Sequence, residues 1–77
     1  MSINMALVQA RKAKGDISQA QVARDLKLSR TYYNQIENGV RVPSLVVAAR
    51  IAQYFGQRVD ELFPAAVVAK SDEQASA

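Results

Sequence analysis

The sequence predicts an all-α protein of five short helices, and three observations predict it. Apolar residues recur at the three- and four-residue spacing of helices, and no segment alternates as strands do. A serine precedes three of the expected helices, where its hydroxyl can accept hydrogen bonds from free backbone amides. Each of the 3 glycines follows an expected helix, where a left-handed backbone is often needed. Short helices joined by short turns predict an orthogonal bundle.

The first helix is expected over residues 3–14. Ile3, Leu7 and Ala10 lie on one side of it, and charged residues lie mostly elsewhere, which is the pattern of an amphipathic helix. Gly15 follows as a natural C-cap, because glycine adopts the left-handed conformation without a steric penalty.

The next two helices each begin after a serine and are joined by a tight turn. Ser18 is expected to cap a helix over residues 19–26. Ser29 is expected to cap a helix over residues 30–38, which Gly39 closes. This arrangement predicts a helix-turn-helix at the second and third helices.

The fourth helix differs from the others because it is apolar nearly all round. It is expected over residues 45–55, between the cap Ser44 and Gly56, and it must be covered on more than one side. A last short helix is expected over residues 59–63 and is stopped by Pro64.

Length and composition leave room for one domain and exclude several classes of site. We expect a domain over residues 1–64 and a partly disordered tail over residues 65–77. The chain has no cysteine and no histidine, so we expect no disulfide, no metal or other cofactor and no catalytic role. No apolar stretch is long enough to cross a bilayer, so we expect a cytoplasmic protein without membrane contact.

Positive charge is concentrated in the body of the chain. Residues 1–58 carry nine Lys or Arg and three Asp or Glu, whereas residues 59–77 carry one Lys and four acids. A basic body suits a polyanionic partner such as nucleic acid. A solvated basic surface would explain the charge alone equally well.

The third helix gathers the side chains that suit recognition of base edges. Arg30, Thr31, Asn34 and Gln35 fall on one side of it at helical spacing, while Tyr33 and Ile36 face the core. Arginine, asparagine and glutamine carry the paired donors and acceptors that match bases in the major groove. We therefore expect the helix over residues 30–38 to enter the major groove of double-stranded DNA.

Over residues 6–63 the chain resembles the helix-turn-helix family of phage repressor and Cro proteins, which includes xenobiotic-response-element-type regulators and restriction-modification controller proteins. The resemblance implies the fold of the lambda-repressor-like DNA-binding domains. The matching positions are Ser18-Gln19, Val22-Ala23, Ser29-Arg30-Thr31-Tyr32, Ile36-Glu37-Asn38-Gly39, Arg41, Pro43-Ser44-Leu45, Ile51-Ala52, Gly56 and Asp60-Glu61-Leu62-Phe63.

The resemblance implies roles for several of these residues. Arg30, Thr31 and Gln35 match positions from which the family reads bases. Gln19 would contact a phosphate and brace the recognition helix. The positions expected to touch the DNA phosphates are Gln19, Tyr32, Asn38 and Arg41.

Glu37 matches a position that pairs with a basic residue of the first helix. The turn that contains Gly15 is one residue longer than usual, which leaves two partners open. The partner is Arg11 if the turn absorbs the extra residue, and Lys12 if it does not.

An apolar patch near the end of the chain predicts a homodimer. Val46 replaces a usually polar residue, and the controller proteins pair through their fourth and fifth helices. A tail that folds back over its own core is the alternative. The residues expected at the dimer interface are Val46, Tyr54, Phe55, Leu62 and Phe63.

The resulting hypothesis is a sequence-specific transcriptional regulator that binds an inverted repeat as a homodimer. Repression is favoured over activation, which would require contact with RNA polymerase. The alternative is an antitoxin, whose further partner is a toxin, or a protein-interaction module on the same fold.

Overall fold

The computed structural model describes residues 3–64, and in this range it contains helices and no strands. The helices are α1 (Met5–Ala13), α2 (Gln19–Leu26), α3 (Arg30–Glu37), α4 (Leu45–Phe55) and α5 (Val59–Leu62). The all-helical prediction with five helices is confirmed for the described residues. The expected tail over residues 65–77 lies outside them.

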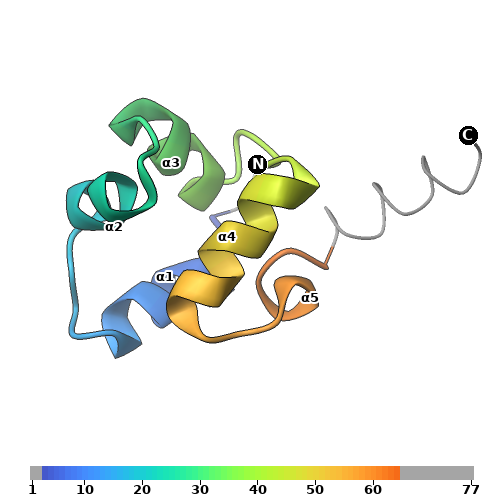
Figure 1. Ribbon diagram of the computed structural model, residues 1–77, viewed down its shortest axis with the longest axis horizontal. Helices are drawn as coiled ribbons and strands as arrows, with labels where there is room; N and C mark the ends of the chain where they lie inside the picture. Colours follow the sequence, from blue (N-terminus) through green and yellow to red (C-terminus); the bar gives the residue numbers. More distant parts are fainter. Residues whose placement is uncertain (1–2, 65–77) are drawn as a thin grey trace, which may run out of the picture. The chain divides into compact units, whose positions relative to one another are not determined.

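The chain divides into two units between Val42 and Pro43. In the first unit α1 and α2 both pack against α3, and in the second α4 packs against α5. Figure 1 shows the first unit in blue to green and the second in yellow to orange. The predicted helix-turn-helix, α2 and α3, therefore lies within the first unit.

The three predicted serine caps are confirmed. The hydroxyls of Ser18, Ser29 and Ser44 accept hydrogen bonds from backbone N–H groups three residues later, at 3.1, 3.0 and 3.2 Å. Each bond satisfies one of the amides that a helix start leaves without an intrahelical partner. The starts of α2, α3 and α4 agree with the sequence prediction for this reason, whereas α3 ends at Glu37, one residue before the predicted end.

The prediction for the first helix was wrong at its start. Asn4 caps it, because its Oδ1 accepts a hydrogen bond from the Leu7 amide at 3.0 Å. Ile3 therefore precedes the helix and is 57% exposed, rather than packing on its apolar face. At the other end Lys14 is the C-cap, and Gly15 and Asp16 follow with φ angles of 98° and 56°.

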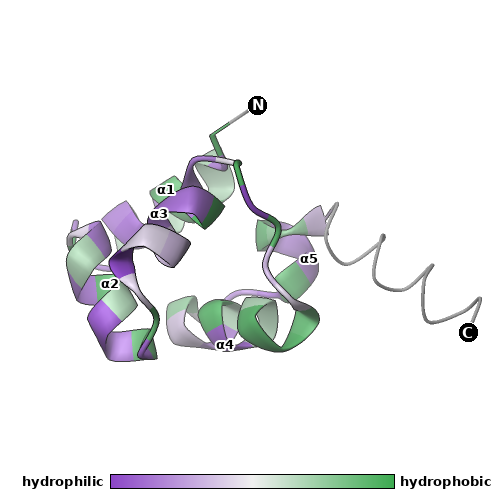
Figure 2. Ribbon diagram, turned by 90° about the horizontal axis from the view of Figure 1, so that it is seen from above, coloured by the Kyte–Doolittle hydropathy of each residue, from purple (hydrophilic) through white to green (hydrophobic). Residues whose placement is uncertain are grey.

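The core of the first unit comes from all three of its helices. Buried apolar side chains recur at helical spacing on each, as the periodicity predicted. Figure 2 shows the result as hydrophobic and hydrophilic segments that alternate along α2 and α3. These residues are Leu7, Ala10, Val22, Ala23, Leu26, Tyr33 and Ile36.

Helix α4 of the second unit is more apolar than the helices of the first, and Figure 2 shows it mostly in the hydrophobic colour. The buried residues of α4 are Ala48, Ile51 and Ala52, while Val46 on the same helix is 71% exposed. The start of the short helix α5 is stabilised by a capping hydrogen bond, which the Glu61 carboxylate accepts from the Arg58 amide at 2.8 Å.

Candidate nucleic-acid interface

Helix α3 has one face inside the protein and one face toward solvent. Tyr33, Ile36 and Glu37 are buried. On the other side, Arg30 and Thr31 are exposed, and Asn34 and Gln35 are partly exposed. The four side chains expected to read bases are thus outside the core. Tyr33 and Ile36 face inward, as expected.

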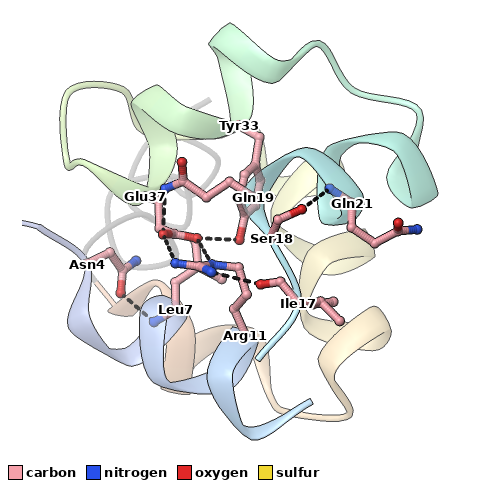
Figure 3. Close-up of polar contacts among 9 residues, drawn as sticks. All are labelled: Asn4, Leu7, Arg11, Ile17, Ser18, Gln19, Gln21, Tyr33 and Glu37. Carbon is pink, nitrogen blue, oxygen red and sulfur yellow. Dashed lines mark hydrogen bonds and ion pairs between the residues drawn. The ribbon is translucent and has the colours of Figure 1, made fainter. Parts of the chain in front are cut away.

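The inward face is centred on the carboxylate of Glu37, which is 1% exposed (Figure 3). Arg11 donates two hydrogen bonds to it as a fork, from Nε and Nη2, each at 3.0 Å. Gln19 donates from Nε2 to Oε1 at 2.7 Å, and the Tyr33 hydroxyl donates to Oε2 at 2.8 Å. Four donors therefore meet the roughly four lone-pair sites of a carboxylate.

These contacts decide the protonation of Glu37. Burial alone would raise the pKa of its carboxyl, but hydrogen bonds from Arg11, Gln19 and Tyr33 and the charge of Arg11 hold that pKa below its ordinary value. Conversely, the hydrogen bonds to Glu37 raise the pKa of Arg11, against the opposing effect of its burial. The pair is therefore ionised at neutral pH.

The carboxylate joins the three helices of the first unit. Arg11 comes from α1, Gln19 is the first residue of α2, and Tyr33 and Glu37 lie on α3. Two backbone contacts extend this arrangement. The carbonyl of Glu37 accepts from the Asn4 amide, and that of Ile17 accepts from Arg11 Nη1, both at 2.8 Å. We call the side chains of Arg11, Gln19, Tyr33 and Glu37 the Glu37 cluster.

The Glu37 cluster answers the question that the sequence left open. The partner of Glu37 is Arg11 and not Lys12, which is exposed. The long turn absorbs its extra residue through the two consecutive positive φ angles at Gly15 and Asp16. The bracing contact expected of Gln19 is present, whereas the hydroxyl contact from Tyr33 was not predicted from the sequence.

The outward face begins at the amino terminus of α3, whose first amides are not all used inside the helix. Arg30 and Thr31 are the first two residues of the helix, directly after Ser29. Tyr32 is partly exposed, and Asn38 and Arg41 are exposed. All residues expected to touch bases or phosphates are thus accessible at least in part, including Gln19.

The end of α3 folds back on Gln35. Gly39, at φ 78°, allows the amide of Val40 to donate to the Gln35 carbonyl at 2.9 Å, while the Gly39 amide donates to Ile36 at 3.2 Å. This pair of bonds is a Schellman motif. It brings Arg41 beside the helix, and Arg41 Nε donates to Gln35 Oε1 at 2.9 Å. This contact was not predicted from the sequence, in which the Asn-Gly at the helix end was the available signal.

The residues expected at a dimer interface divide into two groups. Val46 is exposed, and Tyr54 and Phe55 are partly exposed, with their rings edge-to-face at a centroid distance of 5.0 Å. Leu62 and Phe63 belong to the buried core, at 1% and 5% exposed. A partner chain can therefore contact the first group directly but not the second.

The part of the chain over residues 3–64 contains no group of acidic or other metal-binding side chains arranged to hold a metal ion. None of its helices is long and apolar enough to cross a membrane. Its buried side-chain nitrogen and oxygen atoms all have hydrogen-bond partners.

Comparison with known proteins identifies the family. A family model described as Helix-turn-helix matches residues 7–62, which covers all of α2 and α3. The chain belongs to this helix-turn-helix family. The resemblance to phage repressor and Cro proteins is thereby confirmed.

Two relatives of this helix-turn-helix protein are similar over most of its length. Control protein C.MunI of Mycoplasma sp is 46% identical over 57 residues, which are 74% of this chain and 77% of that protein. The uncharacterized HTH-type transcriptional regulator YqaF of Bacillus subtilis (strain 168) is 40% identical over 50 residues, 65% of this chain and 64% of that protein. The chain is therefore a DNA-binding regulatory protein.

Proposed function

We propose that this protein is a sequence-specific regulator of transcription that inserts α3 into the major groove of double-stranded DNA. The observation that carries the proposal is the division of α3 into a clamped inner face and an accessible polar outer face. A recognition helix needs both, because base contacts specify only when the scaffold fixes their position.

The proposed base-reading residues are Arg30, Thr31, Asn34 and Gln35. Their side chains offer the donor and acceptor pairs that distinguish base pairs in the major groove, and a good two-bonded contact contributes roughly 1–3 kcal/mol of discrimination. Their exposure in the free protein supports this role.

The proposed phosphate contacts are Gln19, Tyr32, Asn38 and Arg41. Gln19 lies at the start of α2, and a helix start favours phosphate through its free amides and its positive dipole end. One N–H of its amide is donated to Glu37, and the other has no partner within residues 3–64, which leaves it for a phosphate. Such contacts set the register of the protein on DNA.

We further propose that the protein acts in the cytoplasm as a homodimer on an inverted repeat, and that it represses by covering a promoter. The exposed Val46 and the partly exposed Tyr54 and Phe55 support a second protomer at α4. Two recognition helices would then meet half-sites about 34 Å apart, one turn of the duplex. The similarity to a protein named Control protein C.MunI supports a controller role for this chain.

A salt titration of duplex binding tests the DNA-binding role. The logarithm of the binding constant is expected to fall linearly with the logarithm of salt concentration, with a slope of about −0.9 for each phosphate that a Lys or Arg neutralises. Arg41→Ala removes one such cation and should make the slope shallower by about one unit. Binding that hardly responds to salt would contradict the proposal and favour the alternative of a protein-interaction module or antitoxin.

Val46→Glu tests the dimer. A carboxylate at the exposed position should disfavour burial against a second copy, so sedimentation should change from dimer to monomer while the helical content stays the same. Gln53→Glu, also at an exposed position of α4, is the matched control. If Val46→Glu remained a dimer, the proposal that α4 forms the interface would be wrong.

A further inference from the structure

Arg41 is held beside Gln35 by three kinds of contact. Its backbone amide donates to the Gln35 carbonyl at 3.2 Å, and its Nε donates to Gln35 Oε1 at 2.9 Å. Its guanidinium lies over the Tyr32 ring, 5.6 Å from the centroid, within the range of cation–π attraction. All three residues belong to the first unit, and none of these contacts requires DNA.

The contact fixes which way round the Gln35 amide lies. Arginine has donors and no acceptor, so the atom that meets Arg41 Nε must be the amide oxygen and not the nitrogen. The oxygen of Gln35 is thus engaged by a cation, while the contact uses neither of the two N–H donors on its nitrogen. Gln35 is therefore oriented to donate hydrogen bonds from its amide nitrogen.

We propose that Arg41 is a specificity-determining residue, which sets Gln35 to read guanine in place of adenine. The proposal rests on the proposed role of Gln35 in reading bases. It assigns to Arg41 a function beyond contact with a phosphate, since its guanidinium positions the amide that meets the base.

The chemistry of the base edges gives the direction of the preference. A glutamine that reads adenine with two bonds must accept from N6 with its oxygen and donate to N7 with its nitrogen. In this protein the oxygen already accepts from Arg41, and the positive guanidinium opposes the approach of a second donor. Guanine presents two acceptors, O6 and N7, which suit the N–H donors of Gln35 that the contact with Arg41 leaves available.

Four duplexes that differ only at the base read by Gln35 test this inference. That base is the one whose preference Gln35→Ala abolishes. By fluorescence anisotropy, wild type should bind the guanine duplex roughly tenfold more tightly than the adenine duplex. Arg41→Met, which keeps an apolar stem over Tyr32 but removes every donor, should reduce this ratio to near one or reverse it.

Arg24→Met is the matched control, because it removes the same charge from an exposed arginine that contacts Gln21 and not Gln35. It should leave the ratio of guanine to adenine binding unchanged. If Arg41→Met weakened binding to all four duplexes by one common factor, the inference would be overturned, but base reading by α3 would still stand. Failure of wild type to prefer any duplex sequence would instead remove the proposed function.

A second measurement does not depend on DNA. In the free protein the side-chain amide of Gln35 should give a large heteronuclear NOE, as expected of an ordered group, and Arg41→Met should lower it while Arg24→Met does not. An equally mobile Gln35 amide in wild type and Arg41→Met would show that Arg41 does not position it.

Discussion

Both faces of α3 carry polar groups, but the two faces use them in opposite ways. On the inner face the carboxylate of Glu37 is buried and accepts four hydrogen bonds from three helices. On the outer face, Arg30, Thr31 and Gln35 keep side-chain donors that no other residue within 3–64 accepts. A buried polar group must be satisfied or it destabilises the fold, whereas an exposed one can be satisfied by water or by a ligand. The inner face thus fixes the helix, and the outer face is left for recognition.

The largest expected difference between the two faces is in stability. Glu37→Gln should lower the free energy of unfolding by about 3–5 kcal/mol, because it leaves Arg11 charged and partly buried without its counter-ion. Gln35→Ala, two residues away on the outer face, should change it by less than about 0.5 kcal/mol. Urea denaturation followed by circular dichroism measures both. Equal losses of unfolding free energy in the two variants would contradict the distinction between the faces.

A smaller loss of stability is expected when the ion pair is broken from the side of α1. Arg11→Met should cost about 2–4 kcal/mol of unfolding free energy, because the Glu37 carboxylate then stays buried with its two strongest donors removed. Lys12→Met is the control, since Lys12 is the neighbouring cation and is exposed. The same denaturation assay should give near-wild-type stability for Lys12→Met. The reverse ranking would contradict the ion pair.

The pH dependence of stability is the mildest test. The folded pKa of Glu37 lies below its ordinary value of 4.5, so its contribution is fully present above pH 4.5 and is lost as the pH falls through the folded pKa. Each unit of difference between the two pKa values corresponds to about 1.4 kcal/mol. Between neutral pH and pH 3, wild type should therefore lose more stability than Glu37→Gln. Parallel curves would mean that Glu37 is not held ionised.

The sequence predicted the parts of this fold that depend on local chemistry. Ser18, Ser29 and Ser44 were recognisable because a serine cap acts within one turn of its own helix. Tyr33 and Ile36 were assigned to the inner face by helical periodicity alone. These features need no knowledge of distant residues.

The features that the sequence did not predict depend on backbone geometry between helices. The choice between Arg11 and Lys12 rests on how the turn at Gly15 and Asp16 bends, which residue spacing does not specify. The contact between Gln35 and Arg41 arises from the Schellman motif, which closes a separation of six residues. A polar pattern shows that side chains share a face, but not which of their atoms remain available.

The most direct test of α3 as a recognition helix is selection of bound sites from random duplexes, with wild type and Gln35→Ala in parallel. Wild type should enrich an inverted repeat, and Gln35→Ala should enrich the same repeat with the preference lost at one base pair in each half-site. Failure of wild type to enrich any sequence, or identical motifs from both proteins, would contradict base reading by the outer face of α3.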